Sequence, residues 1–461
     1  MIETDTLIIG GGLAGLSAAR ALQGKRKYIL CERDPRLGGL AASVKKNGFT
    51  FDYSGHLLHL RWPKTKKLIL NLLDGNYALI KRKARIFSRG VYTHYPFQAN
   101  LSGLPDAVKS ECVRGFLAAY AAGRSQVADK RIAYRGKGLR NKETQTLYPA
   151  PSALAPGQEV FSHWSRRVFG EGISKHFMLP YNSKLWRYPL EKLSTEWCAP
   201  FVPRPTLKQV LEGAYLRKKE TLGYNSSFYY PLEGGIQALP DAFARGLTSI
   251  ERNCAVTAID LKNKTAICGC LGQVKFKHLI NTSALNDFIA KLVAPPCAVK
   301  QAAKKLRHNT VYVLNLGVKN VGCGIHWAYF PEKKFPFYRA GIASNFSKRL
   351  APEGLASFYI EVSTPGAPLN RTGAEAAVIK GLIDCALVKR EGDITESLWL
   401  KIPRAYVIYN RERAQSLPII FDWLETLRAQ SIGRYGSWKY SFMEESVKEG
   451  LEAAEKILSY G

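Results

Sequence analysis

The sequence predicts an α/β protein with two interleaved domains, and three observations support this prediction. The chain has 461 residues, more than one ordinary domain holds, and 46% of them are apolar, which allows a sizeable core. Near the N-terminus an apolar strand runs through a glycine turn into a helix. A second glycine turn, Gly433–Gly436, leads into a helical pattern at the C-terminus. We expect both ends to fold into one domain that the intervening segments interrupt.

The first turn has the spacing of a phosphate-binding loop. Residues 6–9 predict a strand, Leu13–Leu22 predicts a helix of small residues, and three glycines accompany the turn between them. Gly10 permits the turn, Gly12 lets the backbone approach a pyrophosphate, and Gly15 lets the helix pack closely on the strand. The phosphates would lie at the helix N-terminus, where unpaired N–H groups and the helix dipole favour negative charge. A purely structural glycine turn is the alternative.

The next segment favours FAD as the dinucleotide. Residues 28–32 predict a second strand that ends at Glu32, about twenty residues after Gly10, where a carboxylate binds a ribose. Arg33 follows, and then the glycine pair Gly38-Gly39. This pair resembles the second glycine motif of dinucleotide-fold flavoproteins, which nicotinamide enzymes usually lack. The sequence therefore predicts a Rossmann-like FAD-binding domain of the glutathione-reductase type, with NAD(P)H as a candidate reductant.

The rest of the chain alternates helical and extended patterns. Helices are expected at 64–73, 104–122, 160–169, 208–219, 237–247, 374–388 and 447–459. Strands are expected at 49–53, 224–231, 254–260, 264–270, 278–282, 310–318 and 356–363. Residues 138–158 are rich in Gly, Pro, Ser and Thr and predict a flexible loop. We assign 1–60, 223–300 and 404–461 to the discontinuous FAD-binding domain, and 61–222 and 301–403 to a substrate domain of mixed sheet and helices.

Several motifs resemble fungal-type UDP-galactopyranose mutases, within the wider superfamily of amine oxidases and protoporphyrinogen oxidases. They are Gly55-His56, Tyr95-Pro96-Phe97, the run from Phe177 to Trp186, Trp327-Ala328-Tyr329-Phe330-Pro331, the run from Pro336 to Ser347, and the tail from Gly433 to Met443. The resemblance covers most of the chain. In the resembled family, N5 of the reduced flavin attacks the anomeric carbon, and the sugar ring recloses at a different size without net oxidation.

The resemblance implies a set of site residues. Catalytic roles are expected for His56, Tyr329, Arg339, Tyr406 and Tyr440. FAD contacts are expected at Gly10, Gly12, Gly15, Glu32, Arg33, Gly38, Gly39, His56, Val256, Gly433, Gly436, Tyr440, Ser441 and Met443. Substrate contacts are expected at Tyr95, Phe97, Tyr181, Asn182, Trp186, Trp327, Tyr329, Arg339 and Asn345.

Two of these residues also have simpler interpretations. By the resemblance Arg339 meets the substrate diphosphate, but an arginine flanked by aromatics on a sheet is also a common structural ion-pair site. By the resemblance His56 belongs to a mobile loop beside the isoalloxazine, and a loop histidine capped by backbone is the alternative. His56 and His59 have the spacing of half a metal site, yet no third ligand is evident. We therefore expect no metal.

Three functional hypotheses remain. The first is a mutase that acts on a nucleotide-linked sugar. The sequence departs from the family at one position, because Leu179 replaces an arginine that meets the diphosphate in the family, and a leaving dianion needs cationic partners. The second hypothesis is an oxidase or dehydrogenase of the amine oxidase or protoporphyrinogen oxidase type, for which an apolar pocket suffices. The third is a flavin-bearing protein that binds an acidic polymer through its basic surface.

Composition limits the partners and the compartment. The formal net charge of +30 predicts attraction to anions, such as an anionic small-molecule substrate or, peripherally, a membrane surface. No nucleic-acid module accompanies the charge, so no specific nucleic-acid partner is expected. Nine cysteines without a Cys-x-x-Cys pair should be reduced and mostly buried. No run is long enough to span a membrane and no signal peptide is evident, so we expect a cytoplasmic protein, of unassigned oligomeric state.

Overall fold

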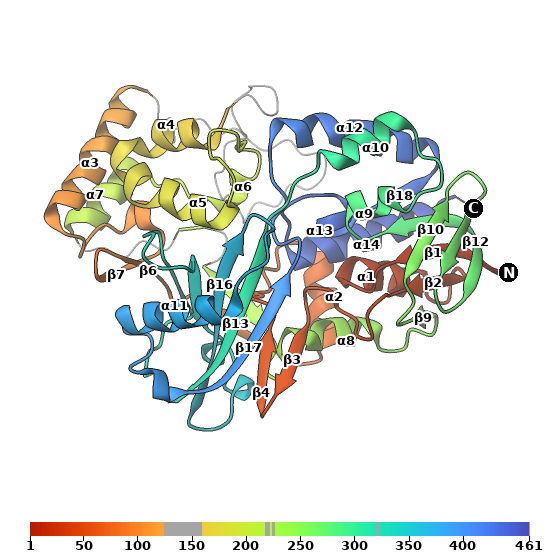
Figure 1. The fold of residues 1–461 in the computed structure, drawn as a ribbon, viewed down its shortest axis with the longest axis horizontal. Coiled ribbons are helices and arrows are strands. Elements are labelled where there is room, and N and C mark those ends of the chain that lie inside the picture. The colour runs from red at the N-terminus through yellow and green to blue at the C-terminus, as the bar shows by residue number, and fades with distance from the viewer. Residues whose placement is uncertain (124–158, 217–221, 224–225, 320–321, 461) are drawn as a thin grey trace.

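The computed structural model describes residues 1–123, 159–216, 222–223, 226–319 and 322–460. Within these residues the chain forms two sheets of seven strands and two smaller ribbons, with helices packed on and above the sheets (Figure 1). The predicted α/β fold is confirmed. The predicted loop at 138–158 lies outside the described residues.

The first sheet, at the right of Figure 1, has the order β10-β11-β12-β1-β2-β9, with β18 paired to β12. Its strands are β1 (Ile2–Ile9), β2 (Tyr28–Cys31), β9 (Ile250–Glu251), β10 (Val256–Asp260), β11 (Thr265–Cys268), β12 (Gly272–Asn281) and β18 (Ala429–Ser431). The strands β12, β1, β2, β9 and β18 are parallel, whereas β10, β11 and β12 form an antiparallel meander. The side chains of Leu7 and Ile8 are fully buried on opposite faces of β1, as both faces of a parallel sheet require.

The helices of this half come from both ends of the chain and pack together. They are α1 (Leu13–Leu22), α8 (Ala238–Ala244), α9 (Leu285–Ala290), α10 (Cys297–Lys304), α12 (Arg411–Thr426), α13 (Gly433–Gly436) and α14 (Met443–Leu458). The last helix, α14, packs so closely on α1 that a Cβ at Gly450 would collide with Ser17. Both termini lie at this side of the molecule (Figure 1).

The second sheet has the order β17-β13-β16-β15-β14-β6-β7. Its strands are β6 (Ala84–Ser88), β7 (Val91–His94), β13 (Thr310–Lys319), β14 (Trp327–Tyr329), β15 (Arg339–Ile342), β16 (Leu355–Thr364) and β17 (Ile394–Ile402). A group of helices stands at the upper left of Figure 1: α3 (Asp106–Ala121), α4 (Phe161–Ile173), α5 (Leu179–Trp186), α6 (Cys198–Phe201) and α7 (Leu207–Tyr215). The remaining elements are α2 (Pro63–Leu73), α11 (Arg371–Asp384), and the ribbons β3 (Ser43–Lys46) with β4 (Phe49–Asp52) and β5 (Ala78–Lys81) with β8 (Ser227–Tyr230). The predicted domain bounds stay predictions.

Several elements differ from the sequence-based expectation. The strand β13 extends one residue beyond the predicted range of 310–318, and all its residues except Lys319 are buried, because it lies inside the sheet between β16 and β17. The helix expected at 237–247 is shorter: a 3-10 turn precedes α8. The C-terminal helix begins earlier than expected, at Met443. The strand β17 and the helix α12 were not predicted.

The expectation that every cysteine is reduced is wrong for one pair. Cys254 and Cys270 form a disulfide, with their Cα atoms 5.1 Å apart. The hairpin brings them together, because β10 and β11 pair antiparallel with Val256 opposite Cys268. The other seven cysteines are free, and five of these are buried.

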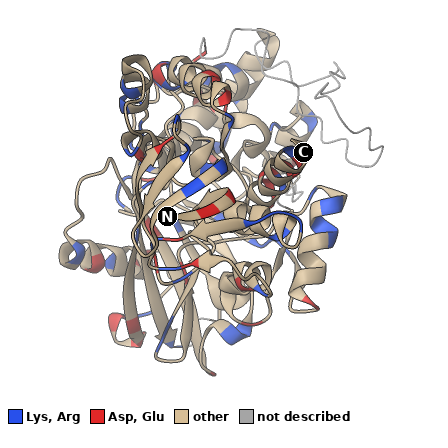
Figure 2. Cartoon of the chain, turned by 90° about the vertical axis from the view of Figure 1, so that its right-hand side faces the viewer, with Lys and Arg blue, Asp and Glu red and all other residues tan. Residues whose placement is uncertain are grey.

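The positive charge is distributed over many elements. Figure 2 shows Lys and Arg on several helices and strands of the face in view, not gathered on a single element. Within the described parts of the chain, no helix combines the length and apolar character needed to cross a bilayer.

Candidate active site and cofactor cavity

A cavity of about 950 Å³ is lined by residues of both sheets and of the helices above them. The first sheet contributes the glycine turn and Glu32. The second contributes Arg339 and Glu361. The cavity therefore lies where a group bound to the first sheet would meet side chains of the second.

Bare backbone forms the part of the cavity next to Gly12. Gly10 has a φ of +101°, and a Cβ on Gly15 would collide with the carbonyl oxygen of Gly10. These two glycines therefore permit the turn and the packing of α1. A Cβ on Gly12, which borders the cavity, would meet no atom within 4 Å. Gly39, with a φ of +58°, lies against Gly12, and Gly38 donates its N–H to Gly11 O at 2.8 Å. This cradle at a helix N-terminus fits a pyrophosphate.

Glu32 is fixed at the cavity wall by the backbone. Its side chain is nearly buried and accepts hydrogen bonds from Gly11 N at 2.6 Å and from Asp34 N at 2.9 Å. Val256 borders the cavity as well. Arg33 also borders it, with an exposed side chain whose Nε lies 3.7 Å from Asp34 Oδ2.

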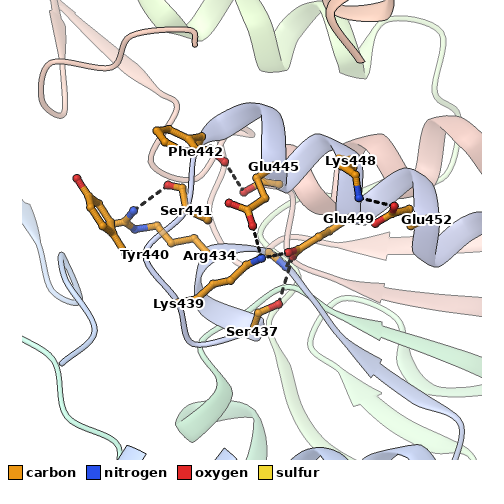
Figure 3. Close-up of polar contacts among 12 residues, drawn as sticks. Arg434, Ser437, Lys439, Tyr440, Ser441, Phe442, Glu445, Lys448, Glu449 and Glu452 are labelled. Carbon is orange, nitrogen blue, oxygen red and sulfur yellow. Dashed lines mark hydrogen bonds and ion pairs between the residues drawn. The ribbon is translucent and has the colours of Figure 1, made fainter. Parts of the chain in front are cut away.

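The C-terminal turn is held by an ion cluster on α14 (Figure 3). Gly433, with a φ of +79°, donates its N–H to Glu449 Oε2 at 2.6 Å, and Ser437 Oγ donates to the same oxygen at 3.2 Å. Lys439 pairs with Glu449 and lies 2.5 Å from Glu445 Oε1. Burial opposes the charge of Lys439, but the two carboxylates outweigh it and raise its pKa above the ordinary value. The turn is thereby fixed against the helix.

Arg434 is a cavity residue that the sequence analysis overlooked. Its Nη1 donates to Ser441 O at 3.1 Å and its Nη2 to Ala405 O at 2.6 Å. Its guanidinium carbon lies 5.5 Å from the ring centre of Tyr406 and 5.0 Å from that of Tyr440. Arg434 therefore positions both tyrosines. The signal was available, because Arg434 lies inside the glycine motif of the tail.

The other predicted residues of the tail divide into two groups. Ser441 and Met443 border the cavity, and Ser441 Oγ is buried without a hydrogen-bond partner among the described residues. Such an orphaned hydroxyl fits a polar ligand. Gly436 does not border the cavity, and a Cβ there would lie 2.9 Å from Asn281 O, so this glycine serves packing.

Arg339 lies in the cavity as one half of a buried ion pair. Its Nε donates to Glu361 Oε2 at 2.8 Å, and its Nη2 donates to Glu361 Oε1 at 2.5 Å and to Ser54 Oγ at 3.1 Å. Burial opposes the charge of Arg339, yet the pairing keeps its pKa above the ordinary value. Burial likewise opposes the charge of Glu361, yet Arg339 lowers its pKa. Arg339 is therefore one half of a structural ion pair and also faces the cavity.

Glu361 was missed by the sequence analysis. It lies opposite Arg339 in the register of β15 and β16, and it is 1% exposed. A single acid in the otherwise apolar strand from Phe358 to Val362 was the available signal, because a buried carboxylate needs a partner.

Aromatic side chains surround the ion pair. The ring of Tyr329 lies 5.2 Å from that of Tyr95 and 5.4 Å from that of Tyr181, and the ring of Tyr406 lies 5.4 Å from that of Tyr440. All five border the cavity, as do Asn182, Trp186 and Trp327. Burial raises the pKa of Tyr181, Tyr406 and Tyr440, so these phenols stay protonated at neutral pH.

His56 borders the cavity as a neutral imidazole. Burial lowers its pKa to about 4, and Arg434 and Arg339 act in the same direction against the opposing effect of Glu361. Its Nδ1 has no hydrogen-bond partner within the described parts of the chain. In those parts, no group of three His, Cys, Asp or Glu side chains could hold a metal ion.

Besides Gly15 and Gly436, three residues singled out from the sequence lie away from the cavity lining. Phe97 is fully buried and stacks on Phe177 with ring centres 5.0 Å apart. Asn345 donates to the carbonyl oxygens of Cys323 and Ile325 and so holds a loop. Leu179 borders a separate surface hollow, so it leaves no gap in the cavity wall.

Comparison with known proteins places these features in context. The sequence model described as flavin containing amine oxidoreductase matches residues 13–334. The fold is similar to that of a reduced UDP-galactopyranose mutase, with 26% identity, a TM-score of 0.87, and coverage of 99% of this chain and 96% of that chain. It is also similar to a putative protoporphyrinogen oxidase from Exiguobacterium sp. 255-15, with 14% identity, a TM-score of 0.71 and 99% coverage of both chains. A wild-type putrescine oxidase bound to putrescine has 14% identity, a TM-score of 0.66 and 99% coverage of both chains. At such identities the likeness to the two oxidases shows the fold alone.

Proposed function

Since this chain belongs to the family of flavin-containing amine oxidoreductases, whose FAD it binds, we propose that it rearranges the sugar ring of a nucleotide-linked sugar, as a mutase. The observation that carries the proposal is Arg339, a cation inside an aromatic cavity shared by the two sheets. The likeness to a UDP-galactopyranose mutase over the whole chain supports it.

The chain provides a binding site for both halves of FAD. The cradle of Gly12 and Gly39 would hold the pyrophosphate, and Glu32 would accept from the ribose hydroxyls. The turn at Gly433 and the N-terminus of α14 would meet the flavin, with the helix dipole favouring negative charge there. When bound and reduced, FAD supplies a nucleophilic nitrogen for attack on the anomeric carbon.

Arg339 would bind the diphosphate that leaves the sugar. Its Nε and Nη2 are engaged by Glu361 and Ser54, while no described residue forms a hydrogen bond with Nη1. A phosphate oxygen can therefore approach Nη1 without breaking the pair. Glu361 holds the guanidinium plane in place and partly compensates its charge, which avoids an unpaired buried cation while the site is empty of substrate.

The tyrosines and His56 would orient the sugar and exclude water. Burial keeps the phenols of Tyr181 and Tyr406 protonated, so they donate hydrogen bonds to sugar hydroxyls and do not act as bases. His56 is neutral at pH 7 and can accept or donate one hydrogen bond. No protein acid or base is required if the reacting atoms are held in line.

The test is conversion of UDP-galactopyranose to its furanose isomer by the FAD-loaded protein under anaerobic, reducing conditions, followed by chromatography. We expect conversion without consumption of the reductant. Arg339→Ala should abolish conversion and UDP binding. The control is Arg349→Ala, which removes an exposed arginine that pairs with Glu233 outside the cavity. No isomer under reducing conditions, or unchanged UDP affinity in Arg339→Ala, would overturn the proposal.

A second candidate, an FAD-dependent oxidase, is favoured by the pairing of Arg339 with Glu361. A compensated arginine inside a cage of tyrosines also suits an uncharged substrate that loses a hydride. Oxygen consumption with a panel of amines and porphyrinogens, together with no sugar isomerisation, would support this candidate over the mutase.

A further inference from the structure

Four sulfur atoms gather beside the wall that carries Glu32. Cys31 ends β2 directly before Glu32, and Cys254 precedes β10. Both border the FAD cavity together with Val256. Cys254 N donates to Glu32 O at 2.8 Å, so the two segments that would hold the adenosine half of FAD are joined at this point.

The four sulfurs form a chain from the surface to the cavity. Cys270 is exposed and is bonded to the buried Cys254. The Sγ of Cys254 lies 3.9 Å from the Sγ of Cys31, which is 2% exposed. Cys31 in turn shares a hydrogen bond with the buried Cys268. A disulfide with one half at the surface and the other beside a third thiol has the arrangement needed for thiol exchange.

We propose that the Cys254–Cys270 disulfide is a thiol-exchange site through which a dithiol reductant controls how firmly FAD is held. The site is independent of the mutase proposal, because it requires only FAD binding. Its partner is any accessible dithiol, attacking from the solvent at Cys270.

The exchange balances in two steps. A thiolate of the dithiol attacks Cys270 Sγ, forms a mixed disulfide, and the bond to Cys254 breaks with the electron pair on Cys254 Sγ. The second thiol of the dithiol then attacks the mixed disulfide, releases Cys270 as a thiolate, and leaves the dithiol oxidised to a cyclic disulfide. Each new thiolate takes up a proton given by the attacking thiols.

Cys31 is placed to assist the first step. The Cys268 hydrogen bond and burial both raise the pKa of Cys31, so its thiol stays protonated. A thiolate on Cys254 is a stronger acceptor than the neutral Cys268 thiol, so the S–H of Cys31 can turn from Cys268 to the departing sulfur 3.9 Å away.

Reduction would loosen the wall of the cavity. The disulfide ties the turn after β11 to the segment 254–256, which is also held by the hydrogen bond from Gly269 N to Ala255 O at 2.9 Å and by the pairing of Val256 with Cys268. Losing a covalent tie in a short loop increases the freedom of the segment that carries Val256. We therefore expect faster release of FAD from the reduced protein.

The experiment measures free thiols and FAD release on the FAD-loaded protein purified without reductant. Denatured without reductant, the protein should show seven thiols, and after reduction nine. Dithiothreitol should accelerate FAD release several-fold in the native chain. Cys270→Ser should release FAD at that faster rate without responding to dithiothreitol. Cys297→Ser, which removes another exposed cysteine, should behave as the native chain.

A second variant tests the buried donor. Cys31→Ala should slow reduction of the disulfide, measured by the appearance of thiols. Nine thiols in the protein as purified, stoichiometric zinc bound to the sulfurs, or FAD release that is indifferent to dithiothreitol would each overturn the proposal.

Discussion

Replacing Glu361 by glutamine should tighten the binding of UDP if Arg339 is the anion-binding group. The glutamine keeps the size of the side chain and one acceptor oxygen for Arg339, but it removes the compensating charge. The cation would then act on a phosphate without an opposing carboxylate beside it. This substitution therefore separates the two interpretations of Arg339, the structural ion pair and the diphosphate site.

The expected size follows from Coulomb's law. A carboxylate about 8 Å from a phosphate repels it by about 2 kcal/mol at an effective dielectric constant near 20. Removal of this repulsion corresponds to about thirtyfold tighter UDP binding. The same change weakens a buried pair whose carboxylate is 1% exposed, so we expect it to lower the free energy of unfolding by about 2–3 kcal/mol.

Calorimetric titration of UDP into the FAD-loaded, reduced protein measures the affinity. The matched control is Glu396→Gln, because Glu396 lies on β17 of the same sheet as Glu361 and pairs with Lys46, but does not border the cavity. It should leave UDP affinity unchanged. If Glu361→Gln keeps its flavin spectrum and yet binds UDP no better than the native chain, the reasoning on Arg339 is refuted.

Three further predictions concern cofactor binding and stability. Gly12→Ala should fold normally but lose FAD, measured by flavin absorbance, because its methyl group would enter the cradle; Gly392→Ala, also free of close neighbours, should keep FAD. Lys439→Met should weaken FAD binding and lower the free energy of unfolding by about 1–3 kcal/mol, because it leaves the Glu449 carboxylate without its lysine. Lys448→Met should change neither, because the ion pair of Lys448 with Glu452 on α14 is more exposed. Burial raises the pKa of Asp52 from 3.8 to about 6, so the folded state binds the proton more tightly. The contribution of Asp52 to the free energy of unfolding should fall by up to about 3 kcal/mol as pH rises from about 4 to about 6. Denaturant unfolding of the native chain and of Asp52→Asn at each pH measures it as a difference, because buried His56, with its pKa lowered to about 4, changes the stability of both proteins in the opposite direction.

The dinucleotide turn was predictable because its constraints are local. Gly10 needs a positive φ and Gly15 needs close packing, and both requirements can be recognised from glycine spacing alone. The helix at Leu13–Leu22 was predicted with its observed bounds for the same reason. FAD as the cofactor and the membership of the amine oxidase superfamily followed from these motifs and are confirmed.

The ion pair and the disulfide were not predictable, because their partners meet only across strands. Glu361 faces Arg339 through the register of β15 and β16, which no local pattern reveals. Cys254 and Cys270 meet through the register of a hairpin. Gly436 has the spacing of a cofactor glycine but packs against Asn281, and only the assembled sheet distinguishes these two uses.

The contact between α1 and α14 has a consequence for the order in which the protein can be made. Glu444, at the start of α14, accepts hydrogen bonds from the backbone N–H of Arg61 and Trp62 at 2.6 and 2.9 Å and so closes the N-terminus of α2. Helix α14 thus packs on α1, holds the start of α2 and holds the turn at Gly433. The ribosome makes α14 after α1, α2 and the other described elements, so the cofactor site is assembled only once α14 has emerged, and a chain truncated before Met443 should collect no flavin.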